Sequence, residues 1–166
     1  MDYSVLLGAH SHTRWLVLVA GALAMVLPQL NQEHSSKSKL PALIFMIICD
    51  LQLTLGFLLY FGDSPFGIKA FSEGMGHVMS TSAIRKIAVE HFALMLVAFV
   101  MAHVAYAKIK NTDQQALVKK FSLIFIGISM VCICGNSSNY LYSFKEKNKM
   151  ISKITKARIF LVVIII

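Results

Sequence analysis

Two histidines occupy matching places in two apolar segments of the chain. His10 lies seven residues after the start of an apolar run at Tyr3, and His91 lies seven residues after the start of another run at Ile84. If both runs are helices that cross a membrane in the same direction, the two imidazoles lie at the same depth. Imidazole nitrogens are axial ligands of haem iron, and the cores of helix bundles hold such cofactors. His10 and His91 are therefore candidate metal ligands for one haem.

Other polar side chains accompany the two histidines. Arg14 follows His10 by one helical turn on the same face, and Glu90 adjoins His91. A second apolar run carries Gln52 near its middle. Ionisable side chains inside a membrane are costly, so each indicates a functional site. In the haem interpretation Arg14 neutralises a propionate, and Gln52 or Glu90 orients an imidazole.

The same residues are compatible with two other interpretations. In the first, no cofactor is present and Arg14 forms a structural ion pair with Glu90 or Asp50, which also lies in the second run. In the second, Glu90, His91 and Asp50 form a proton relay that continues toward His103. His103 lies about 18 Å deeper than His91, on a different face, and we expect it to make a helix–helix hydrogen bond.

The composition identifies the kind of element that must position these residues. The chain has 166 residues, of which 57% are apolar and only 14% are charged, and its mean hydropathy is +0.67. Average soluble proteins are about 25% charged, so the chain is expected to be an integral membrane protein. Three cysteines without a C-x-x-C motif exclude a disulfide scaffold and a covalently attached haem. No phosphate-binding or zinc-hydrolase motif is present, so we expect an electron carrier or a membrane subunit rather than an enzyme.

Four apolar runs predict an all-α fold, an up-down four-helix membrane bundle with a basic C-terminal tail. Polar turns join the first run to the second and the third to the fourth, whereas a glycine-punctuated loop joins the second to the third. The membrane domain is expected to cover residues 1–142, and the tail covers residues 143–166. The predicted spans are residues 3–30, 40–61, 84–109 and 121–141.

The positive charge of the chain is concentrated at membrane edges and in the tail. The net charge is +8, of which the tail supplies +5. Such a tail favours contact with the anionic headgroups of a lipid bilayer, so nucleic acid is not an expected partner. The two short turns carry six Lys side chains against three Lys and Arg on the opposite side, which predicts cytoplasmic turns. Counting the tail reverses this prediction.

Three segments resemble a family of small bacterial four-span membrane proteins that is commonly labelled cytochrome b-like. These segments are HSHTRWLVL at residues 10–18, LQLTLGFLLY at residues 51–60 and RKIAVEH at residues 85–91. The polar signature that the resemblance implies consists of His10, Arg14, Gln52, Glu90 and His91.

The resemblance also implies a function and a location. It implies haem b, electron transfer to or from quinone or other respiratory membrane subunits, and the bacterial inner (cytoplasmic) membrane. The family usually has a histidine immediately before the Leu-Gln pair, and here that position is Asp50.

Overall fold

The computed structural model describes residues 2–30, 39–62 and 64–134. The first two helices are α1, Tyr3–Leu30, and α2, Leu40–Phe61. The third span, Ser82–Lys110, is built from α4 (Ser82–Arg85), a π-helical segment η3 (Lys86–His91) and α5 (Phe92–Lys110). The fourth span, Gln115–Cys134, contains α6 (Gln115–Phe121) and a second π-helical segment, η4 (Ser122–Ile126). The predicted basic tail lies outside the described residues.

Each of these four helices is long and apolar enough to cross a membrane, and the described ranges contain no strand. The predicted all-α, four-helix membrane architecture is therefore confirmed. The bounds of the first two spans match the prediction, and the third begins two residues earlier, at Ser82. The fourth helix begins at Gln115 rather than at residue 121, because helical hydrogen bonds continue through Lys119 and Lys120 above the apolar run. Residues 135–141 of the predicted fourth span lie outside the described part.

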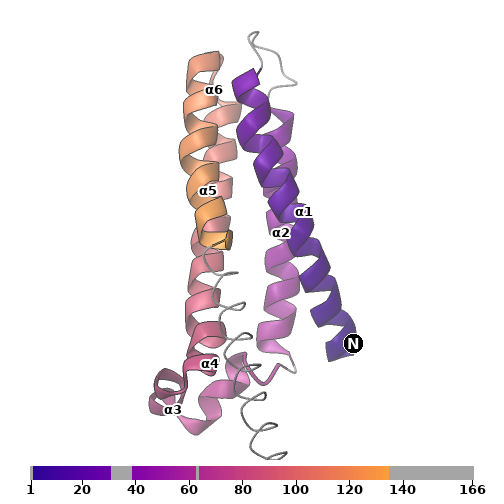
Figure 1. The fold of residues 1–166 in the computed structure, drawn as a ribbon, viewed down its shortest axis with the longest axis vertical. Coiled ribbons are helices and arrows are strands. Elements are labelled where there is room, and N and C mark those ends of the chain that lie inside the picture. The colour runs from indigo at the N-terminus through magenta and orange to yellow at the C-terminus, as the bar shows by residue number, and fades with distance from the viewer. Residues whose placement is uncertain (1, 31–38, 63, 135–166) are drawn as a thin grey trace, which may run out of the picture. The chain divides into compact units, whose positions relative to one another are not determined.

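The four spans pack side by side as an up-down bundle within the unit that ends at Ile133. Figure 1 shows α1 beside α2 and α5 beside α6. Contacts between α2 and α5 and between α1 and the fourth span join the two pairs. At one end of the bundle, the ammonium group of Lys39 donates to the carbonyl of Lys110 at 3.1 Å and lies 3.3 Å from the carboxylate of Asp113. These two contacts of Lys39 join the start of α2 to the turn 111–114 between the third and fourth spans.

Small residues bring the helices close together in the core. Ala98, Ala102 and Ala105 form a buried stripe on α5, and the hydroxyl of Ser129 donates to the carbonyl of Ala98 at 2.9 Å. On α1, Gly21 is buried against the side chains of Met130 and Phe45. Such residues let helix backbones approach in a membrane, where packing replaces the hydrophobic effect as the source of association.

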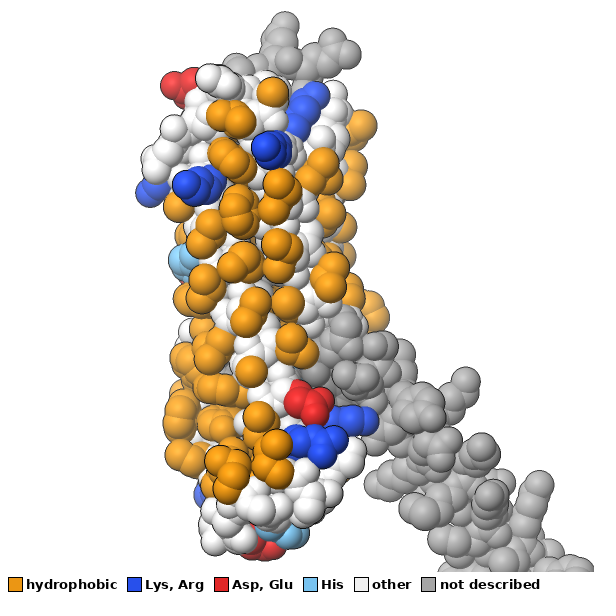
Figure 2. Space-filling view, turned by 90° about the vertical axis from the view of Figure 1, so that its left-hand side faces the viewer, with side chains coloured by type: hydrophobic (Ala, Val, Ile, Leu, Met, Phe, Trp, Pro, Cys, Tyr) orange, Lys and Arg blue, Asp and Glu red, His pale blue; other side chains and the backbone are white. Residues whose placement is uncertain are grey.

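The outer surface is apolar along the middle of the bundle. Large side chains such as Trp15, Leu30 and Val131 are 61%, 70% and 72% exposed. Figure 2 shows hydrophobic side chains covering the middle of one face, with Lys and Arg gathered toward its two ends. This distribution matches a hydrocarbon layer in the middle and charged interfaces on either side.

The segment between the second and third spans is irregular, as the sequence predicts. It contains a 3-10 helix, η2 (Ile68–Glu73), and a short helix, α3 (Met75–Ser80). Gly74 joins them with a φ of 91°, a conformation that favours glycine. Val78 is fully buried against a small apolar cluster that includes Ala88 of η3. The segment therefore packs under the start of the third span, close to the level of His91.

Candidate functional site

The imidazole rings of His10 and His91 face each other between α1 and the third span. Their ring centres are 6.2 Å apart, and their planes are nearly perpendicular, at 83°. Depth along the two helices predicts this pairing from the sequence, and the structure places the two rings together. Both residues are partly buried.

The second helix supports His10 from one side. The side-chain amide of Gln52 donates to the carbonyl of His10 at 3.0 Å, and its nitrogen lies 3.3 Å from each ring nitrogen of His10. The amide oxygen of Gln52 accepts a hydrogen bond from the hydroxyl of Thr13. Because both ends of the amide are engaged, Gln52 is held in one orientation. Sequence reasoning identified Gln52 and missed Thr13, which lies three residues after His10 and whose small hydroxyl gave no distinct signal.

The third span presents His91 at the end of a π-helical segment. In η3 the helix contains an extra residue per turn, a feature that is frequent at functional sites. The hydroxyl of Tyr60 donates to the carbonyl of Ala88 at 3.1 Å, and the Tyr60 ring stacks on Phe92 with centres 4.3 Å apart. These contacts from α2 hold η3 on both sides of His91.

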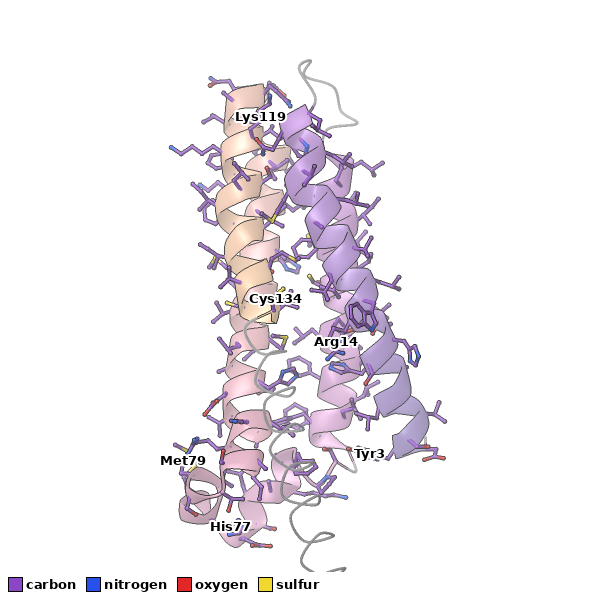
Figure 3. All side chains as sticks on the ribbon, viewed as in Figure 1. Tyr3, Arg14, His77, Met79, Lys119 and Cys134 are labelled. Carbon is purple, nitrogen blue, oxygen red and sulfur yellow. The ribbon has the colours of Figure 1, made fainter. Side chains whose placement is uncertain are left out.

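Arg14 brings a positive charge close to the two imidazoles. Its guanidinium lies within electrostatic range of both His10 and His91, and it lies 5.6 Å from the centre of the Trp15 ring. Figure 3 shows Arg14 on α1, on the half of the helix toward Tyr3. Within the described ranges, Arg14 forms no ion pair with a carboxylate. The expected Arg14 pair with Glu90 or Asp50 is therefore absent from this part of the chain.

Glu90 pairs with another arginine. Its carboxylate lies 3.0 Å from the Nε atom of Arg85, and the guanidinium of Arg85 also donates to the carbonyl of Met79 at 2.8 Å. Glu90 therefore serves to fix the start of the third span. The expected ion pair of Glu90 with Arg14 is corrected, because Glu90 pairs with Arg85, whereas the expectation that Glu90 orients an imidazole stays a prediction.

Asp50 also separates from the predicted cluster. Its carboxylate lies 3.3 Å from the Nε2 atom of His103 on α5. His103 thus contacts a neighbouring helix, but the hydrogen bond expected of it is not formed with this oxygen, which has no aligned donor among the described residues. Measured from the other end of the bundle, Asp50 lies ten residues after Leu40 and His103 lies seven before Lys110, so the depth comparison places the two within about 5 Å of each other along the bundle.

Few side chains near His10 could bind a metal ion. No group of three or more His, Cys, Asp or Glu side chains that could hold a metal ion exists among the described residues. The two imidazoles remain as a pair. With metal–nitrogen bonds of about 2 Å, two imidazoles on opposite sides of one metal ion have ring centres roughly 6 Å apart. The separation of 6.2 Å is within the range at which two imidazoles would hold one metal ion between them.

Two further histidines of the described part of the chain, His12 and His77, lie elsewhere. His12 is exposed and its Nδ1 atom donates to the carbonyl of Gly8 at 2.7 Å, whereas His77 pairs with Glu73 at 3.2 Å in the segment between spans. Neither contributes to the facing imidazole pair.

Comparisons of the chain with protein-family models, with curated proteins and with solved structures gave no match. The fold and the site define a four-span helical membrane protein with a facing histidine pair. The resemblance to the cytochrome b-like family therefore remains a proposal.

Proposed function

We propose that the chain is an electron-transfer subunit of a membrane that binds one haem b between α1 and the third span. The single observation that carries this proposal is the facing imidazole pair of His10 and His91, 6.2 Å apart between ring centres. Bis-histidine ligation needs two imidazoles from separate elements at about this distance.

The surrounding residues have distinct parts in the proposal. His10 and His91 hold the haem iron, and the nearby guanidinium of Arg14 balances the charge of a propionate. Gln52 positions His10 through the contacts described above. Glu90 is engaged by Arg85 and is left out of the haem contacts. Bound haem supplies one-electron redox chemistry, and the polypeptide supplies ligands, orientation and a low-polarity surrounding.

The decisive experiment is an absorption spectrum of the purified protein, oxidised and then reduced with dithionite, after expression with added haem. We expect a Soret band that shifts on reduction and is lost in His10→Ala and in His91→Ala. His12→Ala is the matched control, because His12 lies on the same helix, is exposed and faces no second imidazole. A colourless wild-type protein that is folded and monodisperse would contradict the proposal.

A cofactor-free membrane subunit is the second candidate function. The observation that favours it is the hydrogen-bonded set of Thr13, Gln52 and His10, which is satisfied without any ligand. In that case the polar residues fix helix register, as buried polar groups do in other bundles. This candidate predicts a colourless protein whose stability falls when Gln52 is replaced by Leu.

A proton relay is the third candidate, and Asp50 and His103 favour it because they form a carboxyl–imidazole contact between α2 and α5. It predicts proton flux into vesicles that is abolished by Asp50→Asn without loss of fold. For each candidate the proposed location is the bacterial inner (cytoplasmic) membrane, as a multi-pass protein in contact with the lipid bilayer. For the haem candidate the proposed partners are quinone or other respiratory membrane subunits.

A further inference from the structure

The short helix α3 has one apolar side and one polar side. At about 100° per residue, Met75 and Met79 share a side of the helix next to buried Val78, whereas His77 lies almost opposite Met79. Met75 and Met79 are 60% and 46% exposed, so the described part of the chain leaves this apolar side largely uncovered. His77 is exposed as well and pairs with Glu73. The helix is therefore amphipathic.

Contacts with the ends of the spans fix the level of α3 along the bundle. Val78 is fully buried in a cluster that includes Ala88, and the carbonyl of Ala88 accepts the hydrogen bond from Tyr60 near the end of α2. The chain just before η2 is held at the same place, because the backbone of Tyr60 occupies the space that a Cβ atom at Gly67 would need. The segment that contains α3 therefore lies level with Tyr60.

Tyr60 marks the edge of the hydrocarbon layer. The 22 residues of α2 rise about 33 Å, close to the roughly 30 Å of a hydrocarbon core. Tyr60 is the last residue but one of this helix, and tyrosine is enriched at membrane–water interfaces. The 29 residues of the third span rise about 43 Å and extend beyond that layer, and Arg85 and Lys86 lie near its start. α3 therefore lies at the boundary between hydrocarbon and headgroups.

The two sides of α3 differ in depth. The guanidinium of Arg85 donates to the carbonyl of Met79 at 2.8 Å, which holds α3 in one orientation on the third span. Figure 3 shows Met79 on the outer side of the segment, nearer to the spans, and His77 at the opposite end of the bundle from Lys119. In Figure 2 hydrophobic side chains continue from the middle of the bundle toward the lower end, where His and acidic side chains lie at the tip. The apolar side therefore lies nearer to the lipid-facing surface than the polar side does.

We propose that α3 is an interfacial membrane anchor, with Met75 and Met79 against the upper part of the lipid acyl chains and His77 toward water. An amphipathic helix in such a place buries its apolar face about 5–10 Å into the boundary between headgroups and acyl chains. Methionine suits this surrounding, because its side chain is flexible and fills irregular spaces. Lipid covers this side because the side lies at the boundary that the spans define. The inference does not depend on haem binding.

The test uses the fluorescence of one tryptophan in the full-length protein, reconstituted in lipid nanodiscs. The chain has a single tryptophan, Trp15, so Trp15→Phe gives a background without tryptophan emission. Met79→Trp and its matched control His77→Trp are made in this background, because both replace exposed side chains of α3 on opposite sides. Phosphatidylcholine that is brominated near the top of its acyl chains quenches a tryptophan at the boundary, whereas iodide quenches a tryptophan in water.

We expect the brominated lipid to lower the emission of Met79→Trp several-fold more than that of His77→Trp, and iodide to act in the reverse order. If Met79→Trp fails to fold, Met75→Trp gives the same comparison, because Met75 shares the apolar side. Equal quenching of the two variants by either reagent would show that α3 has no lipid-facing side and would overturn the inference. Quenching of Met79→Trp by neither reagent would mean that another protein chain covers this side, and it would overturn the inference as well.

Discussion

Gly56 of α2 lies directly against the imidazole ring of His10. A Cβ atom at position 56 would lie 3.3 Å from Cε1 and 3.8 Å from Nδ1 of that ring. Gln52 lies one helical turn earlier on the same face and donates to the carbonyl of His10. One face of α2 therefore supports His10, with an amide that binds its backbone and a glycine that admits its ring, while His91 faces it from the third span.

This contact predicts that a larger residue at position 56 displaces His10. We expect Gly56→Leu to lower the haem content of protein expressed with haem, and to destabilise the fold by about 1–3 kcal/mol, the usual cost of overpacking. The haem-to-protein ratio and the thermal unfolding midpoint measure the two effects. Gly8→Leu is the matched control on α1, because a Cβ atom at Gly8 meets nothing within 4 Å. Equal behaviour of the two variants would show that Gly56 does not set the position of His10.

The hydrogen bond between Thr13 and Gln52 predicts a coupling between α1 and α2. Interhelical hydrogen bonds in membranes contribute on average about 0.6 kcal/mol, and at most roughly 1.7 kcal/mol. We therefore expect a double-mutant cycle of Thr13→Val and Gln52→Leu to give a coupling in this range, from unfolding in detergent at equilibrium. The hydroxyl of Thr13 also donates to the carbonyl of Ala9 at 2.9 Å, so the single variant at Thr13 removes more than the coupling. A coupling of zero would mean that Gln52 is held by His10 alone.

Depth along parallel helices was enough to predict the central feature of the site. His10 and His91 were matched because each lies the same distance into its apolar run, and the rings do face each other. The apolar runs also predict the bounds of the first two spans, because a long, predominantly apolar stretch has no alternative to a helix inside lipid. Hydropathy predicts the start of the fourth helix at residue 121, six residues too late, since it marks where a helix enters lipid and not where its hydrogen bonds begin.

The partner of Glu90 could not be predicted from α-helical spacing. Arg85 and Glu90 are five residues apart, and side chains at that spacing do not meet on an α-helix, where neighbours are three or four residues apart. The π-helical segment η3 begins at Lys86 and brings positions five apart onto one face. Sequence patterns do not show an extra residue in a helical turn, so α-helical spacing predicts Arg14 rather than Arg85 as the partner of Glu90.

The pairing of Glu90 predicts which double-mutant cycle shows a coupling. We expect Arg85→Ala and Glu90→Ala to be coupled by less than about 1 kcal/mol, because both side chains are more than a third exposed and solvent weakens the pair. Arg14→Ala and Glu90→Ala are the matched comparison, with an expected coupling of zero. Both cycles use the free energy of unfolding at low salt, where surface charge interactions are largest. A larger coupling for Arg14 than for Arg85 would restore the ion pair that the sequence predicted.

The Lys and Arg residues at the two ends of the bundle predict which end faces the outside of the cell, and labelling of introduced cysteines tests this. The end with Lys39 and the turn 111–114 also carries Lys108, Lys110, Lys119 and Lys120, whereas the end that holds η2 and α3 carries Lys69, Arg85 and Lys86. Short loops rich in Lys and Arg stay in the cytoplasm. A cysteine at exposed Ser72 should therefore react with an impermeant thiol reagent in intact cells, and one at exposed Asn111 should react only after the membrane is opened. Wild-type protein, with Cys49, Cys132 and Cys134 as its own thiols, sets the background. The reverse labelling would indicate that the basic residues beyond position 142 determine the orientation of the chain, because counting them reverses the charge balance.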